Sequence, residues 1–294
     1  MLGPLLFLFY VNDLATIVKC NIEMFADDTK IWTRIGGVDD SRVLQADLSN
    51  LAEWSDKWLL KFNLDKCKVM HIGHEYHTEY ELRSDQITKR LEKTEEEKDL
   101  GVNIVRDLKW SRECHRSANT AMSVLGMIRR SFTHIDQEGF KILYSTYIRP
   151  HLEYCVQVWT PYYKKDIECL EKVQRRATKL LQGLKNLDYQ TRLEKLNLYS
   201  LAQRRIRGHL IEAFKIINGH DNVNSEQFFK KAWTGHLRGN SLKSYKQRAT
   251  KKCRIEFFSQ KVVEDWNKLP DEVVTAPSVE SFKKRLDKHW RVGH

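Results

Sequence analysis

The sequence is poor in the residues that interrupt regular structure, with 5 Pro and 13 Gly among 294 residues. This scarcity excludes collagen-like repeats and most low-complexity chains. The aromatic content is 11% and the hydrophobic content 41%, whereas disordered chains contain few aromatic residues. Length and composition therefore predict a folded chain with one large domain or two of ordinary size.

Closely spaced cysteines are also absent. The six cysteines are scattered and form no C-x-x-C pair (Cys20, Cys67, Cys114, Cys155, Cys169 and Cys253). This pattern excludes a zinc knuckle and a disulfide framework. Scattered free thiols are typical of a reducing compartment, so we expect an intracellular protein of the nucleus or cytoplasm that is not secreted.

No hydrophobic run is long enough to cross a membrane. The apolar opening ends at Asn12 and Asp13, far short of the ~20 residues that a span requires. It has no basic segment before it, which argues against a signal peptide. The pattern instead predicts a buried helix over residues 4–19 that begins at Pro4, and no membrane partner.

Charge is unevenly distributed along the chain. The net charge is +11, from 50 Lys and Arg against 39 Asp and Glu. Residues 1–100 hold 13 basic and 19 acidic residues, a net charge of −6, and residues 101–294 hold 37 and 20, a net charge of +17. The basic part favours a polyanionic partner, although basic helices also occur as ordinary solvated surface.

Apolar periodicity predicts a mixed α/β first third followed by helices. Strands over 21–25 and 29–35 form a β-hairpin, and Asp39 or Ser41 caps a helix that runs to about Phe62. A further strand covers 68–72, exposed loops or a hairpin cover 74–99, and a strand covers 100–105. The remaining predicted helices cover 111–131, 136–148, 164–182, 200–218, 256–268 and 278–290, with a polar, basic, flexible stretch over 221–255.

The tip of the predicted hairpin carries the strongest candidate for chemistry, the sequence Phe25-Ala26-Asp27-Asp28. Adjacent carboxylates on a rigid hairpin suit Mg²⁺, which prefers a few carboxylate oxygens together with water and phosphate. By itself, a pair of aspartates in a turn is also ordinary turn chemistry. The flanking sequence therefore decides how this tip is interpreted.

The flanks resemble the reverse transcriptase of non-LTR (LINE-type) retrotransposons, in particular the Jockey-like clade. Residues 2–14 read LGPLLFLFYVNDL and residues 25–31 read FADDTKI. Similar segments continue in order as FNLDKCK at 62–68, KDLGV at 98–102 and WNKLP at 266–270. The resemblance thus covers nearly the whole chain.

The resemblance implies an α+β fold built from a partial polymerase palm at 1–75, a connecting hairpin at 76–110, a helical thumb at 111–220 and a basic C-terminal region at 221–294. It implies that Asp27, and less directly Asp28, hold Mg²⁺ at the primer end and the deoxynucleoside triphosphate. Lys66 matches a palm lysine that protonates the pyrophosphate leaving group, with an ordinary exposed lysine as the alternative. The implied partners are an RNA template and a DNA primer, or duplex nucleic acid.

The chain departs from the family pattern at its front. Fingers, the first carboxylate motif with its metal-bridging aspartate, and a glutamine-containing loop do not precede residue 2. We therefore expect a remnant that binds nucleic acid without polymerising by itself. The alternatives are an active enzyme whose missing part acts in trans or is lost from the gene model, and a repurposed nucleic-acid- or protein-binding module.

Basic residues on two predicted thumb helices are candidates for phosphate contacts, which position nucleic acid without reading its sequence. A solvated helix face is the alternative. These residues are Arg175, Arg176 and Lys179, and Arg204, Arg205 and Arg207.

Two further groups of side chains fit an ordinary structural role better than a functional one. Trp159, Tyr162 and Tyr163 have the chemistry to stack on bases, but aromatic residues beside a proline are more often packing anchors. His71, His74 and His77 are expected in an exposed polar loop rather than in a metal site.

Overall fold

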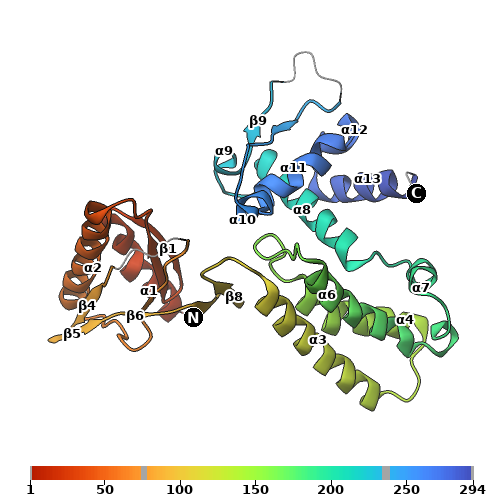
Figure 1. Ribbon diagram of the computed structural model, residues 1–294, viewed down its shortest axis with the longest axis horizontal. Coiled ribbons are helices and arrows are strands. Elements are labelled where there is room, and N and C mark those ends of the chain that lie inside the picture. Colours follow the sequence, from red (N-terminus) through yellow and green to blue (C-terminus); the bar gives the residue numbers. More distant parts are fainter. Residues whose placement is uncertain (1, 74–77, 234–238, 293–294) are drawn as a thin grey trace. The chain divides into compact units, whose positions relative to one another are not determined.

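The computed structural model describes residues 2–73, 78–233 and 239–292. The chain divides into two compact units, the first made of residues 1–97 with 105–107 and the second of 98–104 with 108–294. Helices predominate and all strands described belong to small two-stranded sheets (Figure 1). At this level the predicted α+β class is confirmed.

The first unit consists of short helices, a long helix and short strand pairs. The antiparallel pairs are β1 with β2 and β4 with β5, and the parallel pair is β3 with β6. In order its elements are α1 (Leu2–Val11), a 3₁₀ turn (Asn12–Thr16), β1 (Asn21–Phe25), β2 (Asp28–Trp32), α2 (Val38–Trp58), β3 (Lys68–Val69), β4 (Glu81–Ser84), β5 (Ile87–Arg90) and β6 (Glu92–Lys93).

Helix α2 supplies the centre of this unit's core through Leu48, Leu51 and Trp54. The prediction that Asp39 or Ser41 caps this helix is wrong, because both lie inside it and Gly37 is the N-cap. Tyr80, Leu82 and Leu91 complete the core, although they lie in a segment predicted to be exposed. One inward leucine in a four-residue strand is too short a pattern to reveal burial from sequence.

A buried carboxylate fixes the start of β1 against α2. Asp47, which is fully buried on α2, accepts hydrogen bonds from the backbone N–H groups of Lys19 (3.0 Å) and Cys20 (2.7 Å). Burial alone raises the pKa of Asp47, but hydrogen bonds from Cys20 and Lys19 outweigh it and bring the pKa below its ordinary value. The carboxylate therefore stays charged and holds the strand in place.

The prediction of a buried helix over residues 4–19 is wrong. Helix α1 ends at Val11 and has no buried residue, and Phe9 is 81% exposed. Its contact with α2 is made by Tyr10, whose hydroxyl donates to the carbonyl of Trp58 and whose ring meets the Trp58 ring edge-on at 5.2 Å. An all-round apolar helix needs partners on every side, and within this unit α1 has them on one side only.

The second unit begins with a hairpin and continues almost entirely as helices. Its first hairpin, β7 (Glu96–Asp99) with β8 (Val102–Val105), spans the division between the units. The helices are α3 (Ser111–Ser131), α4 (Gln137–Leu143), a π-helical segment (Tyr144–Ile148), α5 (Arg149–Glu153), α6 (Lys164–Ala177), α7 (Tyr189–Leu196), α8 (Leu201–Ile217), α9 (Ser225–Phe228), α10 (Lys252–Ile255), α11 (Phe258–Lys268), α12 (Asp271–Val274) and α13 (Val279–Val292); β9 (Lys230–Lys231) pairs with β10 (Ser244–Tyr245).

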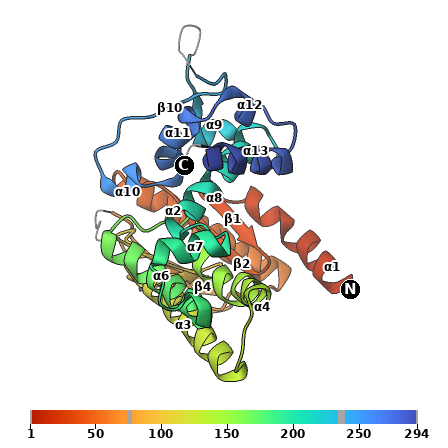
Figure 2. The same cartoon turned by 90° about the vertical axis from the view of Figure 1, so that its right-hand side faces the viewer.

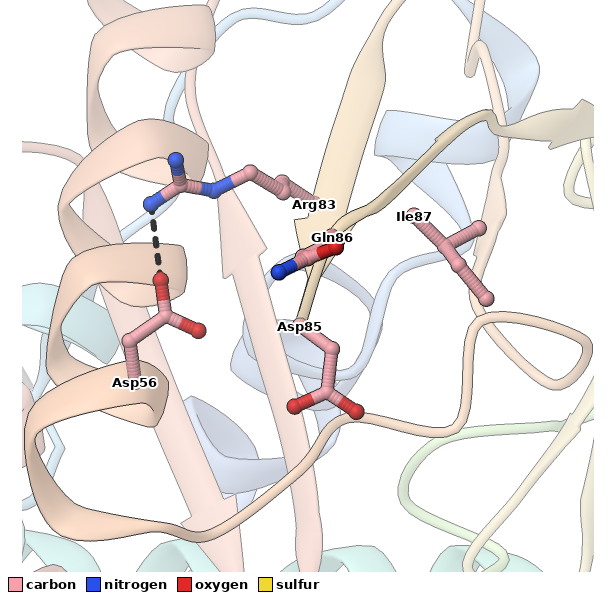
Figure 3. Close-up of a pocket in the computed structure, with 5 residues that line it drawn as sticks. All are labelled: Asp56, Arg83, Asp85, Gln86 and Ile87. Atoms are coloured by element: carbon pink, nitrogen blue, oxygen red, sulfur yellow. Dashed lines mark hydrogen bonds and ion pairs between the residues drawn. The ribbon is translucent and has the colours of Figure 1, made fainter.

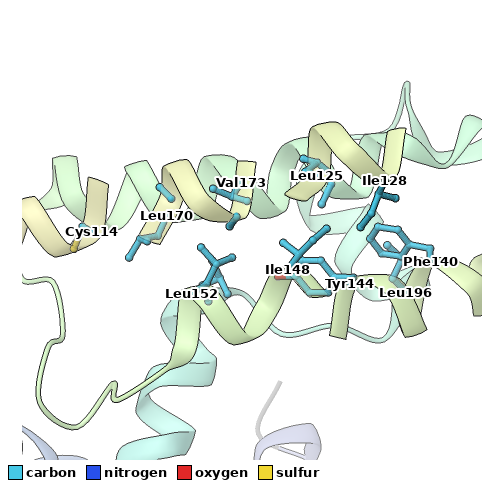
Figure 4. Packing of buried hydrophobic residues seen from close by; sticks show 14 of the residues in the cluster. Cys114, Leu125, Ile128, Phe140, Tyr144, Ile148, Leu152, Leu170, Val173 and Leu196 are labelled. Carbon is cyan, nitrogen blue, oxygen red and sulfur yellow. The ribbon is translucent and has the colours of Figure 1, made fainter. Parts of the chain in front are cut away.

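Two hydrophobic cores fill this unit. In the first, side chains of α3 and α6 meet those of the continuous run from α4 to α5, including Tyr144 and Leu152 (Figure 4). In the second, Phe214 of α8 stacks on Phe282 of α13 with ring centroids 4.3 Å apart. Helix α8 contributes Leu201 to the first core and Phe214 to the second. The predicted helices over 111–131 and 200–218 are confirmed, whereas α7 was not predicted.

A buried histidine predicts how the stability of this unit depends on pH. Burial lowers the pKa of His209 to about 4, and its Nε2 lies 2.9 Å from Thr160 Oγ1 and 3.1 Å from the carbonyl of Val156. The unfolded chain binds the proton of this histidine more readily than the folded chain does. The free energy of unfolding is therefore unaffected by His209 above pH 6.5 and falls by up to about 3 kcal/mol as the pH drops toward 4. Urea unfolding at pH 7.5 and 4.5 measures this loss.

The matched variant is His209→Gln, which keeps a donor for the Val156 carbonyl but does not titrate. We expect it to lose less stability than the parent chain between the same two pH values. An equal loss in both proteins would contradict the assignment of this pH dependence to His209.

Candidate metal site and nucleic-acid interface

The β1–β2 hairpin closes with a two-residue turn made of Ala26 and Asp27. Its register pairs Phe25 with Asp28, and Ala26 has a positive φ of 54°. Positive φ at the first turn position is a feature of type II′ turns, whose twist matches that of antiparallel strands. For a residue with a Cβ atom this conformation costs about 1–2 kcal/mol.

Both candidate carboxylates are exposed. Asp27 lies in the turn, and Asp28 starts β2 on the outward face, opposite the exposed ring of Phe25. The inward face of the hairpin instead carries Ile22 and Ile31 against the core. Neither carboxylate has a hydrogen bond or ion pair with another described residue, so both are free to meet a cation.

This donor set fits one weakly held Mg²⁺ better than a pair of metals. A single Mg²⁺ needs one or two carboxylates and otherwise takes water or phosphate oxygens. Two-metal chemistry requires ligands that bridge both ions, and Asp27 and Asp28 come from one hairpin. Across the described ranges, no three His, Cys, Asp or Glu side chains are grouped so that they can hold a metal ion.

Lys66 lies in the same unit but is not engaged with the carboxylates. It is exposed, its backbone N–H donates to the carbonyl of Asn63 at 3.0 Å, and it makes no ion pair with Asp27 or Asp28. Its role as a proton donor therefore stays a prediction.

Two surface hollows of this unit are lined by residues other than those of the hairpin tip. One, of about 670 Å³, is lined by residues of α2 and of the β4–β5 turn (Figure 3). Its carboxylates already have cations, since Arg83 lies 2.8 Å from Asp56 and Lys61 lies 2.5 Å from Asp85. A second hollow, of about 460 Å³, contains Trp54, whose ring N–H donates to Asp13 at 3.0 Å. In the first hollow, therefore, the carboxylates of Asp56 and Asp85 are not available to a ligand.

The end of α6 presents three cations to solvent. Arg176 and Lys179 are exposed and have no ion pair with another described residue. Arg175 is half-exposed, pairs with Glu168 at 2.9 Å, and lies 5.1 Å from the centre of the Tyr189 ring. These positions leave the three side chains accessible, and their contact with phosphates stays a prediction.

The three arginines of α8 are placed differently. Arg204 pairs with Glu153 of α5 through two hydrogen bonds, and Arg207 pairs with Asp287 of α13 through two more, at 2.7 and 2.8 Å. Arg205 is only 3% exposed and donates to the carbonyl of Leu152 at 2.9 Å. The prediction that these residues face nucleic acid is therefore revised, because their guanidinium groups hold the helices together.

The aromatic and histidine candidates are resolved in part. Trp159 is fully buried and is a packing anchor. The rings of Tyr162 and Tyr163 lie 4.4 Å apart, and Lys252 lies over Tyr162 at 5.8 Å. His71 meets Thr78 at 2.9 Å, while two further candidates, His74 and His77, lie outside the described residues.

All six cysteines are free, as predicted. Burial raises the pKa of the Cys114 thiol to about 12 and that of Cys20 to about 11. Both thiols therefore stay protonated at neutral pH, which makes them poor nucleophiles. Among the described residues, no helix combines the length and the apolar character needed to cross a bilayer.

Comparison with known proteins adds no relative. No protein-family profile, curated protein or solved structure matches this chain.

The geometry of α8 predicts a stability role for Arg207. Replacing Arg207 with Ala leaves Asp287 unpaired and half-buried, so we expect a loss of about 2 kcal/mol in the free energy of unfolding, below the range for fully buried pairs. The salt dependence of nucleic-acid binding should not change. Urea unfolding and binding titrations test the two expectations.

The double variant Arg207→Ala/Asp287→Ala is the control for this pair. It should be less destabilised than the sum of the two single variants. Additive losses, or a reduced salt dependence of binding in Arg207→Ala, would contradict the structural role.

Proposed function

We propose that this chain is the C-terminal part of a reverse transcriptase of the non-LTR retrotransposon type, which binds nucleic acid but does not polymerise by itself. The observation that carries the proposal is the Phe-Ala-Asp-Asp tip. Its two carboxylates lie exposed and unpaired at the turn of a hairpin whose other face is anchored in the core. The ordered series of similar segments along the chain supports the same function.

The hairpin would contribute one part of a catalytic centre. Asp27 and Asp28 would hold Mg²⁺, which neutralises charge on the triphosphate during nucleotidyl transfer. Lys66 would donate the proton to the leaving pyrophosphate. Because both aspartates belong to one hairpin, a second element is needed to bridge two metals. This favours a remnant over an enzyme that is active alone, and the alternative is completion of the site in trans.

The α6 surface supports the nucleic-acid part of the proposal. Arg175, Arg176 and Lys179 form a cluster of exposed or half-exposed cations at one helix end. Phosphate contacts of this kind give affinity that does not depend on sequence but depends strongly on salt.

A primer-extension assay tests the lack of autonomous activity. We expect the purified chain, given an RNA template, an annealed DNA primer, Mg²⁺ and four deoxynucleoside triphosphates, to add no nucleotides. Template-dependent extension that disappears in Asp27→Asn would overturn this expectation. It would mean that another carboxylate of the chain, or of a second copy, completes the site.

A salt titration tests the α6 surface. The triple variant Arg175→Gln, Arg176→Gln and Lys179→Gln should bind duplex DNA more weakly, and the slope of log K against log salt should flatten by about 0.9 for each lost contact. The matched control replaces three exposed lysines of the acidic first unit, each by Gln. These are Lys57, Lys61 and Lys93.

The control removes the same charge from a different place, so its slope should be nearly that of the parent chain. Equal slopes in the α6 variant and the parent would show that this helix does not face nucleic acid. Absence of any nucleic-acid binding at low salt would instead favour a module that binds protein.

A further inference from the structure

The C-terminal sequence WNKLP binds the backbone of a segment that precedes it. The ring N–H of Trp266 donates to the carbonyl of Leu242 at 2.8 Å. The Asn267 side chain accepts from the N–H of Ser244 and donates to its carbonyl, both at 2.9 Å. The end of α11 thereby holds β10, which packs beside it (Figure 2).

A buried asparagine completes this attachment from the other side. Asn240 is 1% exposed, and its amide donates to the carbonyls of Trp266 (3.1 Å) and Leu269 (2.9 Å). The backbone between 240 and 245 is therefore fixed at three points. A hairpin held in this way presents its outward side chains in a defined arrangement.

The outward side of the β9–β10 hairpin combines cations with exposed rings. Lys230 pairs in register with Tyr245, which is 56% exposed. Trp233, just beyond β9, is 94% exposed, more than any other large apolar side chain that the structure describes. An indole exposed to this degree has both faces open to a ligand that stacks on aromatic rings.

The segment that contains this hairpin carries charge of one sign only. Residues 227–255 contain nine Lys and Arg and no Asp or Glu. Lys230, Lys231, Arg248 and Lys251 are exposed and have no ion pair with another described residue. Arg204 and Arg207 of α8, by contrast, are neutralised within the fold. Acids of neighbouring helices contact the segment, since Glu264 pairs with Lys246 and Asp271 accepts from the N–H of Ser241. The four unpaired cations are nevertheless complementary to a polyanion.

The exposed rings narrow the class of polyanion. Single-stranded nucleic acid offers phosphates to cations and unpaired bases to aromatic side chains, whereas a duplex hides the faces of its bases. An anionic membrane also attracts lysine and tryptophan, but it is bound by a continuous apolar face. Here the rings of Trp233 and Tyr245 stand among cations, which favours single strands.

We propose that the basic hairpin surface, formed by Lys230, Lys231, Trp233, Tyr245, Arg248 and Lys251, binds single-stranded nucleic acid. Trp233 and Tyr245 stack on bases, the four cations contact phosphates, and Trp266 and Asn267 are positioning residues that hold the hairpin. The inference rests on the proposed function, because both assume that the partner is nucleic acid. The surface that it concerns is separate from that of α6.

Binding of a labelled oligothymidylate of about 16 nucleotides to the full chain tests the proposal. Trp233→Ala and Tyr245→Ala should each weaken binding about fivefold or more, and Tyr245→Phe, which keeps the ring, should bind like the parent. Heparin, a polyanion without bases, should bind these variants normally. The double variant Lys230→Gln/Lys231→Gln should bind both oligothymidylate and heparin more weakly.

The variants change exposed side chains, so their urea unfolding should match that of the parent and a binding loss reports the surface itself. Oligothymidylate binding that is unchanged in both alanine variants would overturn the proposal, as would equal losses for heparin and oligothymidylate. So would binding to phosphatidylserine vesicles without binding to oligothymidylate.

The α6 triple variant separates this inference from the proposed function. We expect it to lose duplex binding while keeping most of its affinity for oligothymidylate. If it loses both ligands while the hairpin variants lose neither, the hairpin inference fails and the proposed nucleic-acid function stands. If the chain binds neither ligand, both fail together.

Discussion

Helix α8 is shared by the two hydrophobic cores of the second unit, and its arginines are the links that keep both cores attached to it. Leu201 belongs to one core and Phe214 to the other. Arg204 binds Glu153 of α5, while Arg207 binds Asp287 of α13. Removing one partner of such a half-buried pair leaves the other charge only partly hydrated and without a counter-charge. This destabilises the fold more than replacing both residues by apolar ones. The number of Lys and Arg residues in this unit therefore overstates how many cations it can offer to a ligand, because Arg204 and Arg207 are already paired.

This constraint also explains which predictions from sequence succeed. Amphipathic periods over 111–131 and 200–218 specify α3 and α8 because the pattern is local and long. The fate of the α8 arginines could not be predicted, since their partners are 51 and 80 residues distant in the chain. The same holds for Asp47, whose sequence context is that of an ordinary helix surface residue and whose ligands are two backbone N–H groups 27 and 28 residues earlier. Tertiary partners, not local propensity, decide these residues.

The candidate site follows the same division. The hairpin, its turn and the exposure of Asp27 follow from alternation and turn chemistry, so the tip could be predicted from residues 21–32 alone. Its support could not, because the anchor is Asp47, which fixes Lys19 and Cys20 just before β1. Helix α1 shows the opposite failure: its apolar composition predicts burial, but composition does not specify whether a partner layer exists. The exposure of a residue is predicted well when its own turn or strand decides it. It is not predicted when the residue's partners belong to another helix or strand.

The second unit consequently offers two kinds of basic surface whose chemistry differs. At α6 the cations stand without neighbouring free rings, since the ring of Tyr189 lies against Arg175 and its hydroxyl is bound by Glu171. At the β9–β10 hairpin the rings of Trp233 and Tyr245 are open. Phosphate contacts weaken steeply with salt because they release counterions, whereas stacking involves no net charge and persists. If both proposals hold, the two surfaces would distinguish duplex from single strand by whether bases are accessible, without reading their sequence. Under the proposed function, the α6 surface would hold the paired product and the β9–β10 surface the unpaired template.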